Sequence, residues 1–335
     1  MVLSFPFSFG FGVLCVLGSL LSVSSGHWVG VWLGLEINLL GFIPLMVQSG
    51  GSQSVECAIK YFVVQALGSG FLLLGGLGFG SSFCLWFLSD GGSVVSVFLL
   101  FGLVLKLGVA PFHWWVPSVM GGLSWFGCGA LLTWQKLAPF FVVLGLSFPF
   151  CFLFLVFGCF SAVVGGLMGV GQVQLRLLMA YSSISHWGWI LSLVAFSFLG
   201  SLCYYFFYFL LSFFIFYLLS VFGLWRFSQV SGLFSVVLVF GFLSLGGLPP
   251  LTGFVPKWLG LQGVIFGGGV FVVGFLLLGS VLGLYYYLNF VFVVFLGCGE
   301  GYLKSGFSAY SGVVCVGLGF FCLGLPFYDV VFWVF

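Results

Sequence analysis

The sequence predicts an all-α integral membrane protein with about 11 transmembrane helices. Of its 335 residues, 63% are hydrophobic and only 4% are charged, and the mean hydropathy is +1.37. Because this leaves too little polar surface to cover a water-soluble globule, lipid is the expected solvent. The apolar runs are long and continuous rather than alternating, which favours helices of roughly 20 residues over a β-barrel.

We expect one transmembrane domain, 1–335, whose spans are joined by short connections. Each span is an apolar run of bilayer-crossing length. In order, the predicted spans are 3–24, 28–48, 57–80, 91–120, 126–146, 148–170, 173–195, 198–224, 233–265, 268–296 and 311–333. The first run has no Arg-rich and Ser-rich presequence ahead of it, so we expect synthesis next to the membrane that the chain enters.

Two of these spans, 91–120 and 233–265, are overlong and are interrupted by glycine and proline. The predicted helix breaks lie at Gly108, Pro111, Pro117, Pro249 and Pro250. Proline lacks a backbone donor and clashes with the preceding turn, so both helices are expected to open near the middle of the membrane. If 1–146 and 148–296 are two halves, each break falls in the fourth helix of a five-helix unit. Matching interrupted helices are typical of an antiporter-like inverted repeat, with 311–333 as one trailing helix.

Five ionisable side chains inside predicted spans are singled out as candidates, namely Glu36, Lys106, Lys136, His186 and Lys257. A charge near the bilayer centre is costly and normally faces the protein interior with a partner. A carboxylate that approaches or leaves a buried lysine changes the proton affinity of that lysine, and histidine titrates near neutrality. Together these residue types predict a lateral proton relay. We expect serines, Thr133 and the opened backbone at the breaks to hold the waters that complete it.

A simpler role stays open for each of these residues. Glu36 and Lys106 are also compatible with a static ion pair that only fixes helix packing. Lys136 and Lys257 are compatible with snorkelling toward an interface. His186 is compatible with a hydrogen-bonded packing residue.

No cofactor or metal site is expected in this chain. The ten cysteines are scattered through apolar runs without a CxxC pair, so they are interpreted as small buried hydrophobic residues. The glycine-rich stretch at 75–80 lacks the strand and helix context of a nucleotide loop. A net charge of +2 is too small to suggest a nucleic-acid partner. Glu56 and Lys60 are spaced to neutralise each other near the start of a span.

Six stretches carry a family resemblance, in this order: WLGLEINLLGFIPL, ECAIKYFVVQALGS, LKLGVAPFHWWVP, LLTWQKLAP, LRLLMAYSSISHWGW and SLGGLPPLTGFVPKW. They resemble the subunit 2 family of mitochondrial NADH:ubiquinone oxidoreductase, respiratory complex I. The resemblance runs from about residue 28 to residue 260, and the last segments match mainly by hydropathy. Pro256 to Trp258 resembles this family more than its sister antiporter-like subunits.

The resemblance implies a proton-pumping subunit of the membrane arm, of the animal type that lacks three N-terminal helices of bacterial forms. By motif, Glu36 and Lys106 would be the coupling ion pair and Lys136 the central relay lysine. His186 would be a relay histidine and Lys257 the lysine of the outlet half. Nothing residue-specific carries over to the N-terminal stretch, the loop around residue 300 or the tail after 296.

The implied location is the mitochondrial inner membrane, as a multi-pass protein. The implied partners are other membrane-arm subunits of complex I, sister antiporter-like subunits among them, together with membrane lipid. NADH, FMN, iron-sulfur clusters and ubiquinone are implied in partner subunits, so this chain would contribute to an H+-translocating NADH:ubiquinone reductase without a redox site of its own. Two alternatives stay open: a subunit of a cation/proton antiporter, and a purely structural membrane-arm subunit.

Overall fold

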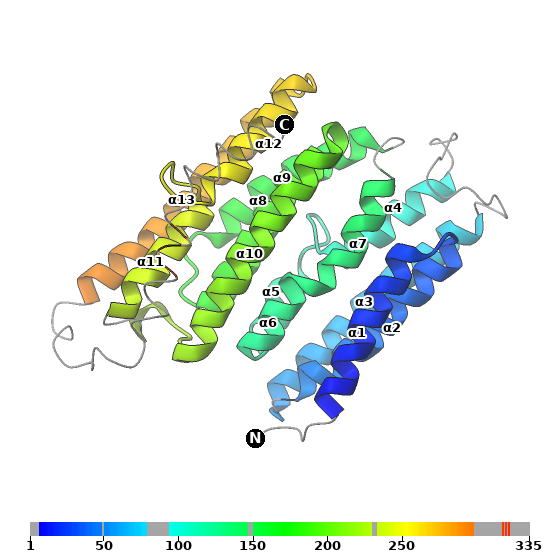
Figure 1. Cartoon of the computed structure of the whole chain (residues 1–335), viewed down its shortest axis with the longest axis horizontal. Coiled ribbons are helices and arrows are strands. Elements are labelled where there is room, and N and C mark those ends of the chain that lie inside the picture. Colours follow the sequence, from blue (N-terminus) through cyan, green and yellow to red (C-terminus); the bar gives the residue numbers. More distant parts are fainter. Residues whose placement is uncertain are drawn as a thin grey trace. The chain divides into compact units, whose positions relative to one another are not determined.

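The computed structural model describes residues 7–48, 50–78, 94–146, 150–229 and 233–297, with residues 317, 319 and 321 (Figure 1). These residues form helices joined by short connections, and within them the only β-type pairing is an isolated bridge between Gln174 and Arg226. Eight of the described helical stretches are long and apolar enough to cross a membrane. The prediction of an all-helical membrane fold is therefore confirmed. The count of 11 helices stays a prediction, because the span at 311–333 lies outside the described residues except for three positions.

Contacts divide the chain into two compact units, residues 1–157 and 158–335. The first unit holds α1 Phe7–Ser24, α2 Trp28–Val47, α3 Ser52–Gly78, α4 Val94–Leu107, α5 Trp115–Met120, α6 Trp125–Leu132 and α7 Trp134–Gly145. The boundary falls within α8 Cys151–Gly169, and the second unit holds α9 Leu175–Phe196, α10 Phe198–Phe222, η1 Phe227–Gln229, α11 Leu233–Gly246, α12 Phe254–Phe266 and α13 Val270–Gly297. The inverted-repeat relation between halves 1–146 and 148–296 concerns symmetry, and it stays a prediction.

Small residues let α1 and α2 pack backbone against backbone. A Cβ atom at Gly18 would lie 2.5 Å from the backbone nitrogen of Asn38, and one at Gly34 would lie 2.4 Å from that of Ser22. Close approach over small residues is a common way for helices to associate in lipid, where burial of apolar surface gives no driving force. This contact holds Asn38 firmly on the buried face of α2.

A second glycine contact joins α3 to α4 in the first unit. A Cβ atom at Gly102 would lie 2.7 Å from the carbonyl oxygen of Gly68, and one at Gly75 would lie 2.7 Å from the nitrogen of Leu99. One turn after Gly102, the side chain of Lys106 passes beside Gly68, where a Cβ atom would lie 3.2 Å from Lys106 Cγ. The close packing of these two helices therefore positions Lys106.

The helix α4 ends at Leu107 in a left-handed glycine turn. Gly108 has a φ of +68°, which favours a residue without a side chain. The Gly108 N–H donates to the carbonyl of Leu105, and the Val109 N–H donates to the carbonyl of Val104. These two bonds make a Schellman motif, which satisfies carbonyls that a helix end otherwise leaves free. Pro111 follows in the non-helical connection, and Pro117 lies in the first turn of α5, where proline is tolerated.

The helix α11 in the second unit also ends in a left-handed glycine turn with a Schellman motif. Gly247 has a φ of +79°, its N–H donates to the carbonyl of Ser244, and the Leu248 N–H donates to the carbonyl of Leu243. Pro249 and Pro250 lie in the connection that follows, before α12 begins at Phe254. Each overlong predicted span is thus two helices that meet at a glycine-terminated C-terminus.

The predicted span 126–146 is bent at Thr133, between α6 and α7. The Thr133 hydroxyl donates to the carbonyl of Gly129 at 2.6 Å, a back-bond that tends to bend helices. Pro139, inside α7, provides no N–H for the carbonyl of Gln135. As a result, Gln135 and Lys136 lie in a locally irregular turn between the bend and the proline.

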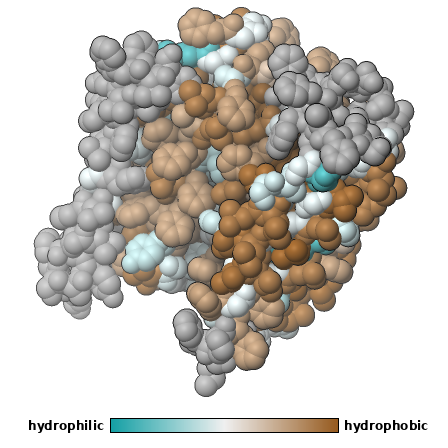
Figure 2. Space-filling model, turned by 45° about the vertical axis from the view of Figure 1, so that its right-hand side comes forward, coloured by the Kyte–Doolittle hydropathy of each residue, from teal (hydrophilic) through white to brown (hydrophobic). Residues whose placement is uncertain are grey.

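The exposed side chains of the described helices are of the kind expected in contact with lipid. Large apolar side chains are exposed along the outer helices, for example Phe271 and Leu296 on α13, at 86% and 85%. Figure 2 shows apolar side chains over most of the described surface in that view. Such a surface is suited to hydrocarbon rather than water.

Candidate functional site

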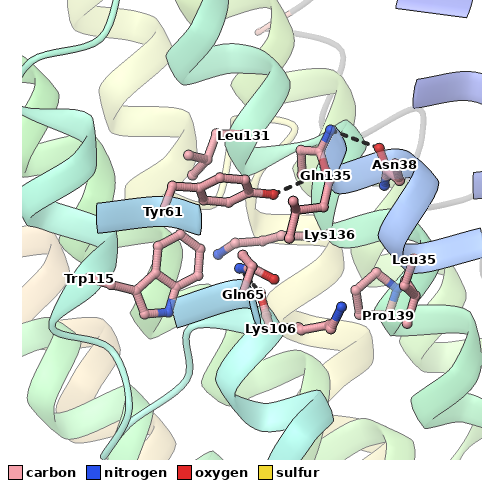
Figure 3. A pocket seen from close by; sticks show the side chains of 11 residues that line it. Leu35, Asn38, Tyr61, Gln65, Lys106, Trp115, Leu131, Gln135, Lys136 and Pro139 are labelled. Carbon is pink, nitrogen blue, oxygen red and sulfur yellow. Dashed lines mark hydrogen bonds between the residues drawn. The ribbon is translucent and has the colours of Figure 1, made fainter. Parts of the chain in front are cut away.

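A small cavity in the first unit is lined by both Lys106 and Lys136 (Figure 3). The cavity has a volume of about 10 Å³, which is room for about one water molecule. Its lining comes from α2 to α7 and consists of Leu35, Asn38, Leu39, Tyr61, Gln65, Lys106, Trp115, Leu131, Gln135, Lys136 and Pro139. Its size suits water or a proton in transit rather than an organic substrate.

Lys106 lies in the last turn of α4 and is only 4% exposed. The carbonyls around it are held by side chains of other helices. The Trp115 indole N–H donates to the carbonyl of Leu105 at 3.1 Å, and the Gln65 amide donates to the carbonyl of Lys106 at 3.4 Å. A cation at a helix C-terminus is also favoured by the helix dipole. These contacts let a buried lysine end a helix inside the protein.

Glu36 lies near the middle of α2, half-buried, and its Oε1 atom is buried without a hydrogen-bond partner among the described residues. Its charge acts on Lys106 from nearby, but the two side chains form no ion pair in the described part of the chain. The predicted coupling pair is therefore open in this structure. Unpaired buried oxygens are uncommon in proteins, which singles out this carboxylate.

Lys136 lies in the first turn of α7 and is 1% exposed, so it does not reach an interface by snorkelling. Beside it, three side chains from three helices form a hydrogen-bonded bridge (Figure 3). The Tyr61 hydroxyl donates to Gln135 Oε1 at 3.3 Å, and Gln135 Nε2 donates to Asn38 Oδ1 at 2.9 Å. We call this set the amide bridge, Tyr61–Gln135–Asn38.

Tyr61, Gln65 and Gln135 were not among the site residues predicted from the sequence. The signal was present, because Gln65 and Gln135 lie well inside apolar spans, where a buried amide needs a partner for the same reason that a charge does. Applied to amides as well as to charges, the argument would have found both. Tyr61 had no such signal, since aromatic residues are abundant throughout the sequence.

In the second unit, Lys257 on α12 donates from Nζ to the carbonyl of Gly246 at 2.7 Å. That carbonyl belongs to the C-terminal end of α11, and the lysine stem lies against Gly247. The sequence contains no Asp or Glu between Asp90 and Glu300, so no described residue of this unit offers a carboxylate. The negative end of the α11 dipole therefore stabilises the Lys257 cation.

His186 is buried on α9, in the same unit as Lys257. Its Nδ1 atom is 3.0 Å from the hydroxyl of Tyr204, and the Tyr208 ring centre lies 5.2 Å from the imidazole. The Lys257 charge is close enough to act on His186. The tyrosines of α10 are a further set that the sequence did not reveal.

The five predicted residues thus fall into two groups. Glu36, Lys106 and Lys136 lie in the first unit, where the two lysines line the cavity, and His186 and Lys257 lie in the second unit. Among the residues that the structure describes, no three His, Cys, Asp or Glu side chains gather as a metal site would require.

Comparisons with known proteins agree on one family. Residues 25–283 match the family described as NADH:quinone oxidoreductase/Mrp antiporter, TM. NADH-ubiquinone oxidoreductase chain 2 of Branchiostoma lanceolatum is 38% identical over 311 residues, covering 89% of this chain and 88% of that protein. A chain of respiratory complex I from Thermus thermophilus, solved with bound aureothin, has a TM-score of 0.80 at 27% identity, over 95% of this chain and 78% of that one. A chain of the Mrp complex from a Dietzia species has a TM-score of 0.79 at 22% identity, over 87% and 60%, which shows a shared fold.

Proposed function

This chain belongs to the NADH:quinone oxidoreductase/Mrp antiporter family, and we propose that it is a proton-translocating membrane-arm subunit of respiratory complex I. The observation that carries the proposal is the pair of buried lysines, Lys106 and Lys136, that line one water-sized cavity. Both lie where a helix ends or bends inside a membrane-spanning chain. Ionisable side chains at this depth are rarely kept without a function.

The chemistry follows from the charges around the cavity. Approach of the Glu36 carboxylate would hold a proton on Lys106, and its withdrawal would weaken that hold. Two lysine cations facing one cavity repel each other, so a proton on one favours release from the other. Because both lysines line a cavity with room for about one water, a proton would pass from Lys106 to Lys136 through a water held there.

We assign His186 and Lys257 to the later part of the same pathway. Lysine, unlike arginine, can give up its proton when buried, and histidine titrates near neutrality. Lys257 is supported by the α11 carbonyl end rather than by a carboxylate, so its charge depends on a helix terminus that a conformational change can move. A conformational change that moves the end of α11 would then change the charge of Lys257.

NADH oxidation and ubiquinone reduction would take place in partner subunits, which bind NADH, FMN, the iron-sulfur clusters and ubiquinone. The partners of this chain would be the other membrane-arm subunits, including sister antiporter-like ones, in the mitochondrial inner membrane. In this arrangement the chain supplies transport and no redox site. The 11-helix inverted repeat belongs to the same proposal.

Replacement of Lys136 by methionine tests the function. In liposomes that contain the assembled complex, we expect Lys136→Met to lower the number of protons translocated per NADH oxidised, because methionine fills the space without carrying a proton. The matched control is Lys60→Met. Lys60 lies on the exposed side of α3 and pairs with Glu56, so its loss should leave the ratio at the wild-type value.

The alternatives give different results in the same assay. A purely structural subunit would keep the wild-type ratio in Lys136→Met once the complex assembles, and this outcome would overturn the proposal. The family model also covers Mrp antiporters. If the chain served as a cation/proton antiporter subunit, proton movement would depend on a sodium gradient and would persist without NADH.

A further inference from the structure

The amide bridge, Tyr61–Gln135–Asn38, joins α2, which carries Glu36, to α7, which carries Lys136, and its tyrosine lies on α3. Asn38 lies on α2, two residues after Glu36, and Gln135 lies on α7, directly before Lys136. The bond from Gln135 Nε2 to Asn38 Oδ1, at 2.9 Å, therefore links the carboxylate helix to the lysine helix. Within the described residues, Glu36 itself forms no ion pair with Lys106, whereas this bond joins α2 to α7 directly.

Each end of the bridge is held in place by packing. Asn38 is fixed by the α1–α2 contact, where its backbone nitrogen would be 2.5 Å from a Cβ atom at Gly18 and its carbonyl accepts a bond from the Cys15 thiol. Tyr61 packs between Phe42 and Trp115, with ring centres 5.4 Å and 5.7 Å away. Since Trp115 also holds the carbonyl of Leu105, the Tyr61 end reaches the turn that carries Lys106.

The middle of the bridge, in contrast, lies where α7 can move. Gln135 is between the bend at Thr133 and Pro139, which gives no N–H to the Gln135 carbonyl. A helix turn with a missing hydrogen bond deforms more easily than a regular one. A displacement of α2 or α3 transmitted through the amide would therefore be taken up at Gln135 and at its neighbour Lys136.

We infer that Gln135 is a positioning residue that transmits movement of the Glu36 helix to Lys136 through its hydrogen bonds to Asn38 and Tyr61. The Gln135 amide can form both hydrogen bonds, because its oxygen accepts from Tyr61 while its nitrogen donates to Asn38. No side chain that offers only a donor or only an acceptor makes both bonds at once. This inference rests on the proposed function and names a residue through which it is controlled.

The test compares four forms of the assembled complex in liposomes: Gln135→Met, Lys136→Met, the double variant and Gln172→Met. Methionine has nearly the shape of glutamine and makes neither bond. Gln172 lies in the connection between α8 and α9, and serves as the matched control that should keep the wild-type ratio of protons to NADH. We expect Gln135→Met to lower this ratio toward the Lys136→Met value while NADH oxidation continues, and the double variant to equal Lys136→Met.

The outcomes separate this inference from the proposed function. If Lys136→Met keeps the wild-type ratio, the proposed function fails. If Lys136→Met lowers the ratio but Gln135→Met does not, or if the double variant falls below Lys136→Met, the inference alone fails. A purely structural role for Gln135 would reduce the amount of assembled complex and leave the ratio unchanged, which also overturns the inference.

A second variant covers the case in which Gln135→Met does not assemble. Tyr61→Phe keeps the ring and its packing and removes only the bond to Gln135 Oε1. We expect its ratio to fall between the wild-type and Lys136→Met values, because the bond to Asn38 remains. A wild-type ratio in assembled Tyr61→Phe complex would overturn the inference.

Discussion

Replacement of Gly102 by alanine should displace Lys106 without touching any ionisable group. The new Cβ atom would lie 2.7 Å from the Gly68 carbonyl oxygen and 2.9 Å from the Leu72 nitrogen, whereas ordinary contact begins at 3.4 Å. The α3 and α4 backbones would thus have to separate by about 0.7 Å at this point. Lys106 lies one turn further along α4 and its stem lies beside Gly68, so it would move with the helix.

Two opposing energies decide the effect on stability. Overpacking of a tight contact costs about 1–3 kcal/mol, while alanine in a helix interior is favoured over glycine by about 0.5–1 kcal/mol. The difference is a net loss of up to about 2.5 kcal/mol. The control is Gly70→Ala on α3, where nothing lies within 4 Å of the new Cβ atom, so only the helix-forming gain remains.

The assay heats the solubilised complex and follows release of this chain, and separately measures protons translocated per NADH in liposomes. We expect Gly102→Ala to lower both the temperature at which this chain is released and the number of protons translocated per NADH. The second effect follows because displacement of Lys106 by a fraction of an ångström steeply slows proton transfer to and from it. Gly70→Ala should lower neither the release temperature nor the ratio of protons to NADH. If Gly102→Ala behaves like Gly70→Ala, the argument that the glycine contact positions Lys106 is refuted.

Three further substitutions test separate parts of the site. Lys257→Arg keeps a cation at the α11 terminus but cannot release a proton, so we expect assembled complex with fewer protons per NADH; a wild-type ratio would show that a fixed charge suffices. Trp115→Phe removes the indole bond to the Leu105 carbonyl and should destabilise the chain by about 1 kcal/mol, seen as earlier release on heating. Tyr204→Phe leaves the buried His186 Nδ1 without its phenol partner and should cost about 1–3 kcal/mol in the same assay, with an unchanged release temperature arguing against that bond.

The sequence predicted the membrane fold and the buried charges for one reason. In hydrocarbon, the cost of a charge or of an unpaired backbone group is so large that composition alone limits the possible structures. Glu36, Lys106, Lys136, His186 and Lys257 were noticeable because each lies far from the ends of an apolar run. Gly108, Pro111, Pro249 and Pro250 were predicted as helix breaks and lie in connections between helices, since these residues act locally, whereas Pro117 lies inside α5.

Partners could not be predicted in the same way, because they come from helices distant in the sequence. Gln135 meets Asn38 across 97 residues and Tyr61 across 74, and nothing in the local pattern of either partner specifies that contact. Glutamine and tyrosine also cost less to bury than a charge, so their presence in a span attracts less notice. The bend at Thr133 was missed for a related reason, since one hydroxyl back-bond does not interrupt an apolar pattern.

By itself, the sequence determined that this protein is helical, lies in a membrane and carries charges that lipid does not tolerate, because these properties depend on the solvation of each residue separately. Only the tertiary structure decided that Lys106 and Lys136 line one cavity, that Glu36 forms no ion pair with Lys106, and that Lys257 is stabilised by a helix end. Those outcomes depend on the distances between side chains of different helices. Such distances are fixed by close packing over small residues such as Gly68 and Gly102, which becomes visible only when the helices are assembled.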